Sequence, residues 1–173
     1  MRRAFGRFID KIAKKDRKII LLVGDIGYGI FDDFRKNHPQ RFLNLGICEQ
    51  SIIGTASGMA LEGLKPWVYT ITPFLIERPF EQIKLDIDQQ KANVKLVGFA
   101  DYPNLGPTHS EINAKQSMKL FKNIDSYFPK DNITEIIDDI LNQFVDKVVY
   151  DNQNTADVIV KHVFDQLAKT DKI

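Results

Sequence analysis

Short apolar runs alternate with helix-period stripes along most of this chain, and that alternation constrains the fold more than any other feature. The run Ile19–Val23 consists only of aliphatic side chains and is followed by Gly24 and Asp25, as expected for a strand that is buried on both faces. Further strands are predicted at residues 42–45, 67–71, 94–100, 124–128 and 148–150. Because parallel neighbours need a crossover, usually a helix, the pattern predicts a three-layer α/β fold with a mostly parallel sheet of about six strands flanked by helices.

Helical patterns separate the predicted strands. Apolar side chains recur on one face at residues 4–13 and 49–61, and Pro79 favours the start of another helix. Thr108–Glu111 and Asn132–Glu135 have the spacing of capping boxes, which predicts a helix after each. A last helix is expected at about 155–170. The sequence contains no Pro/Gly-rich linker, so we expect one domain over residues 1–173, in line with its length.

Composition excludes several classes of protein. The chain has 24 basic and 23 acidic side chains, so its net charge is only +1. A nucleic-acid-binding protein needs a basic face, which this balance of charges does not indicate. The single cysteine, Cys48, excludes a disulfide framework, and the three histidines at 38, 109 and 162 form no metal-ligand pattern. No apolar run approaches the roughly 18 residues of a membrane span, and no signal-like block follows the N-terminus. We therefore expect a soluble, cytoplasmic protein.

Glu49 is the most informative single residue. In open parallel sheets ligands bind beyond the carboxyl ends of the strands, and Glu49 begins a helix just after a predicted strand. It shares the apolar face of that helix with Ile52 and Ala56, while small residues such as Gly58 permit close approach of another backbone or a flat ligand. Partial desolvation there would keep the carboxyl group available as an acid. The alternative is an ordinary acidic residue at the positive end of a helix.

Other residues after the predicted strands allow two interpretations each. The glycines around Asp25 match neither nucleotide-binding pattern, G-x-G-x-x-G or G-x-x-x-x-G-K-[ST], and favour a tight turn. His109 follows Gly106-Pro107-Thr108, a rigid turn that would hold an imidazole at the end of the sheet, although a solvated histidine is the competing interpretation. Phe74 is either a core aromatic or a contact for a ligand. Cys48 has no obvious base partner, which indicates packing.

Taken together, these segments resemble the pyrimidine-binding domain of transketolase-like thiamine diphosphate enzymes. Residues 41–50, R-F-L-N-L-G-I-C-E-Q, are similar to the family's R-F-x-N-x-G-I-x-E-Q. The resemblance continues in the family's order and spacing over about residues 18–150, through residues 54–66, 69–74, 78–86 and 106–109. It implies the fold of that domain, in agreement with the alternation of strands and helices.

The resemblance also implies roles for five residues. Glu49 matches the catalytic glutamate that bonds to ring nitrogen N1′ of the cofactor's aminopyrimidine and, by sharing a proton there, activates the cofactor. Phe74 matches the aromatic residue that packs on the pyrimidine. Asp25 and His109 match positions near the thiazolium ring and the substrate, with His109 as the second catalytic residue. Arg78 belongs to the same motif and is expected among the cofactor-binding residues.

The departures from the family are equally informative. A G-D-G sequence followed by N-N, the family's magnesium and diphosphate motif, is missing, because Gly24 and Asp25 are followed by isoleucine and no Asn-Asn occurs in the chain. The resemblance thus implies that a diphosphate-domain partner chain holds Mg²⁺ and completes a shared thiamine diphosphate site. Asn113-Ala114 replaces an expected Glu-Asp. Asp151-Asn152 stands where sugar-phosphate-using relatives carry an arginine, which argues against a phosphorylated substrate.

These observations predict the pyrimidine-domain subunit of a split transketolase-like enzyme. It would transfer a two-carbon ketol unit from a small ketose, with no metal ligand of its own, and assemble as a homodimer or as a heterotetramer with its partner. Two alternatives remain open: the β-type subunit of a 2-oxoacid-decarboxylating acyl-transfer enzyme, and a catalytically silent binding or regulatory subunit of the same fold.

Overall fold

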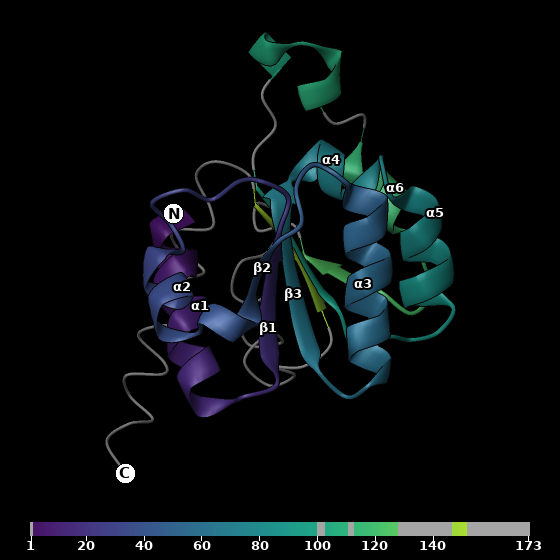
Figure 1. Ribbon diagram of the computed structural model, residues 1–173. Helices are drawn as coiled ribbons and strands as arrows, with labels where there is room; N and C mark the ends of the chain where they lie inside the picture. Colours follow the sequence, from purple (N-terminus) through teal and green to yellow (C-terminus); the bar gives the residue numbers. More distant parts are fainter. Residues whose placement is uncertain (1, 100–102, 111–112, 128–146, 152–173) are drawn as a thin grey trace.

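A computed structural model describes residues 2–99, 103–110, 113–127 and 147–151 of the chain (Figure 1). Within these ranges six strands form one sheet in the order β2-β1-β3-β4-β6-β5, and every neighbouring pair is parallel. The strands are β1 (Ile19–Val23), β2 (Phe42–Asn44), β3 (Lys65–Ile71), β4 (Lys95–Phe99), β5 (Asp125–Tyr127) and β6 (Lys147–Asp151). The predicted parallel sheet is confirmed.

Helices cover both faces of this sheet, which gives the three predicted layers (Figure 1). One face carries α1 (Arg2–Lys15) and α2 (Asp32–Asn37), and the other carries α3 (Glu49–Leu61) and α5 (Phe80–Gln82), which continues as a π-helical segment over Ile83–Asp88. The described helices also include α4 (Thr72–Ile76), α6 (Ala114–Met118) and three 3₁₀ turns, at Pro39–Arg41, Pro103–Leu105 and Pro107–His109. None of the helices in these ranges is long and apolar enough to cross a membrane.

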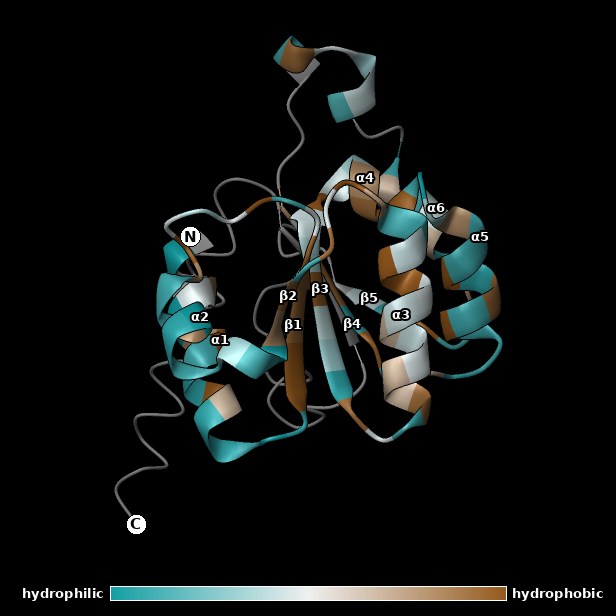
Figure 2. Cartoon of the chain, viewed as in Figure 1, coloured by the Kyte–Doolittle hydropathy of each residue, from teal (hydrophilic) through white to brown (hydrophobic). Residues whose placement is uncertain are grey.

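Strand β1 separates two hydrophobic clusters. Leu21 packs with α1 and α2, and Leu22, on the opposite face, packs with α3 and the π-helical segment; both are 0% exposed. Side chains alternate between the faces of a strand, so a strand covered by helices on both sides needs apolar residues at every position. That requirement explains the uninterrupted Ile19–Val23 run, which is brown along its length in Figure 2.

A helix follows Thr108–Glu111, but the prediction that this segment caps it is wrong. Pro107–His109 forms a single 3₁₀ turn, and Ser110 then adopts an extended conformation (φ −109°, ψ 126°), so the chain leaves helical geometry where the helix should begin. The next helix, α6, starts at Ala114, and the Asn113 side chain caps it by accepting the backbone N–H of Gln116 at 3.0 Å. The asparagine that departs from the family pattern therefore serves as a helix cap.

Some predictions fall outside the described residues. They include the helices expected after Asn132–Glu135 and at 155–170, and residue Asn152. The extent of a single domain over 1–173 stays a prediction. Two short helices, α2 and α4, were not predicted, because six and five residues respectively are too few to show helical periodicity.

Arg41, the first residue of the 41–50 pattern, joins α1 to β1. Its guanidinium donates to the carbonyl oxygens of Ala13 (3.0 Å), Asp16 (3.0 Å) and Ile19 (3.4 Å). It also lies 2.6 Å from Nδ1 of the buried His38. Because a guanidinium has no acceptor, that imidazole nitrogen accepts the bond. Arg41 therefore has a structural role at the end of the sheet opposite to the candidate site.

Candidate functional site

The carboxyl ends of the central strands converge on a closely packed turn. Leu45 N–H donates to Val23 O at 3.1 Å, which joins the loop after β2 to the end of β1. A Cβ atom at Gly24 would lie 3.4 Å from Gly46 O and 3.6 Å from Thr70 Oγ1. Glycine at position 24 thus lets the segments that follow β1 and β2 approach each other and the end of β3, where the sequence predicts a site.

Asn44 cross-links two of these segments. Its Oδ1 accepts the backbone N–H groups of Asp25 (3.0 Å) and Gly46 (3.1 Å), and its Nδ2 donates to Asp25 Oδ1 (3.1 Å). Asp25 has φ +53°, a left-handed conformation that non-glycine residues rarely adopt. The asparagine thereby fixes both the backbone and the carboxylate of Asp25. Sequence analysis included Asn44 only as part of a pattern, because its partner lies 19 positions away.

Tyr28 is a contact that sequence analysis missed. Its hydroxyl donates to Asp25 Oδ1 at 2.7 Å, although 72% of the tyrosine is exposed. The hydrogen bonds from Tyr28 and then Asn44 hold the pKa of Asp25 below its usual value. The same hydrogen bond, and the charge of Asp25, raise the pKa of Tyr28. Asp25 is therefore an exposed carboxylate, oriented by two neighbours, at the carboxyl end of the sheet.

Glu49 is buried and paired. Its side chain is only 4% exposed, and its Oε1 accepts a hydrogen bond of 2.9 Å from Nη1 of Arg78, which follows α4. Ile52, Ile53 and Ala56 are buried on the same helix, so the predicted position of Glu49 on the inner face of α3 is confirmed. The guanidinium compensates the charge of a carboxylate that would be costly to bury alone.

Phe74 joins this ion pair to His109. The Cζ atom of Arg78 lies 3.6 Å from the centroid of the Phe74 ring, a cation–π contact. The imidazole of His109 lies 5.0 Å from the same centroid at an interplanar angle of 61°, and its Nδ1 is 3.1 Å from Thr108 Oγ1. Four of the five predicted site residues thus form one contiguous set, while Asp25 makes its hydrogen bonds with Tyr28 and Asn44.

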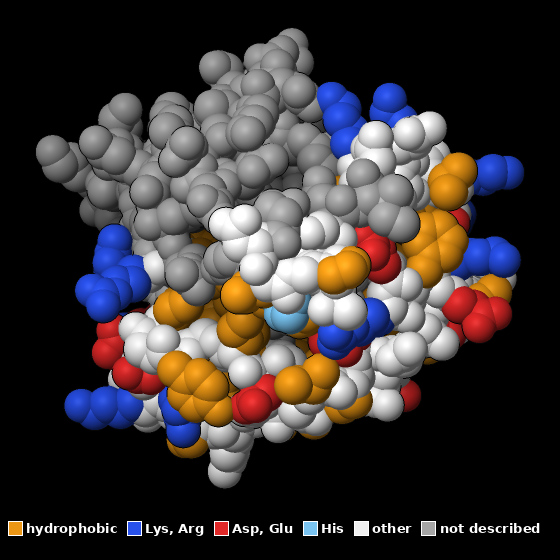
Figure 3. All heavy atoms as spheres, turned by 90° about the horizontal axis from the view of Figure 1, so that it is seen from above, with side chains coloured by type: hydrophobic (Ala, Val, Ile, Leu, Met, Phe, Trp, Pro, Cys, Tyr) orange, Lys and Arg blue, Asp and Glu red, His pale blue; other side chains and the backbone are white. Residues whose placement is uncertain are grey.

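Exposed apolar side chains surround this end of the sheet. Tyr28, Leu45, Ile47 and Leu105, in the loops that follow β1, β2 and β4, have exposed fractions of 36% to 72%. Figure 3 views the molecule from this direction and shows hydrophobic side chains around a histidine, with basic and acidic side chains beside it. Apolar groups gathered at one end of a domain are typical of a surface that associates with another molecule.

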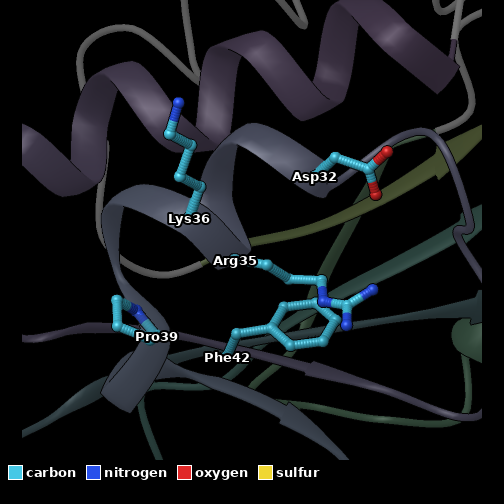
Figure 4. Close-up of a pocket in the computed structure, with 5 residues that line it drawn as sticks. All are labelled: Asp32, Arg35, Lys36, Pro39 and Phe42. Atoms are coloured by element: carbon cyan, nitrogen blue, oxygen red, sulfur yellow. The ribbon is translucent and has the colours of Figure 1, made fainter.

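Two further features lie apart from the candidate chemistry. Cys48 donates through Sγ to Leu45 O at 2.9 Å, in agreement with a packing role. A hollow of about 560 Å³ between α2 and β2 is lined by Asp32, Arg35, Lys36, Pro39 and Phe42 (Figure 4) and contains none of the five site residues. Within the described ranges no group of three or more His, Cys, Asp or Glu side chains is placed to hold a metal ion.

The fold and the site define an α/β domain that presents a buried carboxylate and an aromatic face beyond the carboxyl ends of parallel strands, where such sheets bind their ligands. Residues 1–134 match the family described as transketolase, pyrimidine binding domain. The chain belongs to that family, and the resemblance seen in the sequence is confirmed.

Individual relatives point to the same group of proteins. The chain is 40% identical over 114 residues to an apulose-4-phosphate transketolase subunit of Actinobacillus succinogenes. The aligned residues make up 63% of this chain and 37% of that protein. It is 39% identical over 93 residues to 1-deoxy-D-xylulose-5-phosphate synthase of Clostridium perfringens, covering 53% of this chain and 15% of the synthase. A solved structure described as a split gene transketolase, inactive beta4 tetramer, superposes with a TM-score of 0.70 and 28% identity over 86% of this chain and 49% of that one. The chain thus spans less than half the length of each.

Proposed function

We propose that this chain is the pyrimidine-domain subunit of a split transketolase-like enzyme and that it transfers a two-carbon ketol unit. The observation that carries the proposal is a buried carboxylate, Glu49, and an aromatic ring, Phe74, that both contact Arg78 at the carboxyl end of the sheet. A buried carboxylate and an aromatic ring in the same site suit a flat ligand ring that hydrogen-bonds through its edge and stacks through its face. The aminopyrimidine of thiamine diphosphate has both properties.

Each site residue has a distinct task in this proposal. Thiamine diphosphate, when bound, supplies the carbon that attacks a carbonyl group and holds the electron pair of the cleaved bond. Glu49 holds a proton at the pyrimidine nitrogen, and its low exposure strengthens that interaction. Phe74 packs against the ring. His109, in contact with Phe74, and the oriented carboxylate of Asp25 bind the substrate and the thiazolium side.

A partner chain holds the magnesium ion and the diphosphate in this proposal. The sequence has no G-D-G…N-N motif, and the described part of the chain offers no cluster of metal ligands. Two relatives support the division: the protein from Actinobacillus succinogenes is named as one subunit of a transketolase, and a similar solved structure is described as split and as an inactive tetramer. A second candidate, a synthase related to 1-deoxy-D-xylulose-5-phosphate synthase, is supported by the similarity to the protein of that name from Clostridium perfringens.

The shared site predicts that the chain alone binds thiamine diphosphate at least about a hundredfold more weakly than the assembled complex, because diphosphate and magnesium contribute most of the polar contacts. A hundredfold difference corresponds to about 3 kcal/mol of binding free energy. Calorimetric titration of the chain with thiamine diphosphate and Mg²⁺, with and without the diphosphate-domain partner, measures it. Micromolar, magnesium-dependent binding by this chain alone would contradict a site divided between two polypeptides.

A substitution on the exposed face of α3 tests the proposed assembly with the partner chain. Gly54 and Gly58 are exposed, and no atom outside the helix lies within 4 Å of a Cβ at Gly58. We expect Gly58→Phe to leave the chain folded but to weaken assembly with the partner at least tenfold, because a close interface has no room for the ring. Gly58→Ala is the control, with a gain of about 0.5–1 kcal/mol in folding stability. Light scattering of each variant, alone and with the partner chain, measures the assembly. A Gly58→Phe chain that assembles like the wild type would place the interface elsewhere.

A further inference from the structure

Arg78 contacts both groups that the proposed function assigns to the cofactor's pyrimidine ring. Its Nη1 donates to Glu49 Oε1 at 2.9 Å, and its Cζ lies 3.6 Å from the centroid of the Phe74 ring. At that separation the guanidinium is in van der Waals contact with the ring face, so no second planar group fits between them. One side chain thus covers the aromatic face and pairs with the carboxylate.

The chemistry of the guanidinium makes it a substitute for the pyrimidine. It is planar, cationic, and carries N–H donors at its edge, so it can donate to a carboxylate while its face rests on an aromatic ring. An aminopyrimidine that shares a proton with Glu49 is also planar, carries positive charge, and donates from its edge. Both groups therefore compete for the same two contacts.

The exposure of the two partners indicates which of them moves. The Arg78 side chain is 34% exposed, whereas that of Glu49 is 4% exposed. Arg78 can regain water when it leaves, but Glu49 stays buried and needs a replacement donor at once, because an unpaired buried carboxylate is costly. Departure of the arginine is thus favourable only when another hydrogen-bond donor arrives at Glu49.

We propose that Arg78 is a placeholder that closes the pyrimidine subsite in the free chain and is displaced when the cofactor binds. This inference rests on the proposed function, since it takes Glu49 and Phe74 as the pyrimidine contacts. It assigns Arg78 a competing role where the resemblance implies a cofactor-binding one. The arginine protects a buried carboxylate until the ligand arrives, and it lowers the apparent affinity for that ligand, because only the open fraction of the chain can bind it.

Thiamine, which has the two rings without the diphosphate, is the appropriate probe for the full chain. Titration followed by NMR reports the Arg78 Nε–H resonance, which the Phe74 ring current shifts in the free chain and which should return toward its solvent position as thiamine binds. Arg78→Gln should bind thiamine about tenfold more tightly, the effect of removing one competing cation–π contact. Arg35→Gln is the matched control, because Arg35 lies over the Phe42 ring at 5.5 Å, outside the site.

The outcomes separate this inference from the proposed function. Equal or weaker binding by Arg78→Gln, or an Arg78 resonance that does not move at saturation, overturns the placeholder. If thiamine binding is also unchanged in Glu49→Gln, or is absent from every variant, the pyrimidine site itself is wrong. Thiamine binding that changes in Glu49→Gln, and that Arg78→Gln strengthens while Arg35→Gln does not, supports both the proposed function and the placeholder role of Arg78.

Discussion

Replacement of Glu49 by glutamine is expected to slow exchange of the C2 proton of bound thiamine diphosphate by about a hundredfold or more in the assembled complex, the range of general acid–base effects. The amide has the shape of the carboxyl group but cannot give a proton to the pyrimidine nitrogen or take it back. Because Glu49 is only 3% exposed, water has little access to its position and is a poor substitute for it.

The variant should fold and assemble normally, since the glutamine oxygen can still accept the Arg78 hydrogen bond. Glu62→Gln at the exposed C-terminal end of the same helix is the matched control and should exchange at the wild-type rate. Proton exchange followed by NMR in deuterated buffer measures both. A wild-type rate in Glu49→Gln would remove this residue from the mechanism.

Arg41→Ala is expected to lower the free energy of unfolding by about 3 kcal/mol or more. The side chain donates charge-assisted hydrogen bonds to three backbone carbonyl groups, each of which is worth about 1.5–3 kcal/mol where it is well formed. Its loss removes this donor from the carbonyl groups at the C-terminal end of α1 and the start of β1, and leaves Asp16 O with the longer 3.4 Å bond from the Ile19 N–H. The buried His38 also loses its donor.

Urea denaturation compares this variant with Arg35→Ala, whose exposed side chain should change stability by no more than about 0.5 kcal/mol. Arg41→Lys should lie between the two, since an ammonium group cannot reach carbonyls in several directions at once. Equal stability of Arg41→Ala and Arg35→Ala would show that the hydrogen bonds to α1 contribute little. The prediction also separates this residue from Glu49, whose replacement should affect exchange but not stability.

The fold was predictable where local pattern and tertiary packing agree. Ile19–Val23 and the helix 49–61 have the bounds expected from the sequence, because an all-aliphatic run and a long small-residue helix have strong local signals. Thr108–Glu111 was misleading because a capping-box spacing says nothing about the 3₁₀ turn that Pro107 begins. Short helices such as α4 depend on packing rather than on propensity.

The site was predictable in its residues but not in its pairing. The position of Glu49 on the inner face of its helix follows from spacings of three and four. Its partner Arg78 lies 29 positions away and reaches it only because the fold brings the residue after α4 to the start of α3. The pattern that contains Arg41 and Glu49 also could not show that one supports the fold at one end of the sheet while the other lies at the opposite end.

The lengths of the strands also bear on aggregation. The two outer strands of the described sheet, β2 and β5, have three residues each, whereas β3 in the interior has seven. Short outer strands leave few unpaired amide and carbonyl groups, so they are poor templates for fibrillar pairing. The described chain, with apolar loops exposed at one end of its sheet, is therefore expected to associate through side-chain surfaces, which are selective, rather than by adding strand to strand.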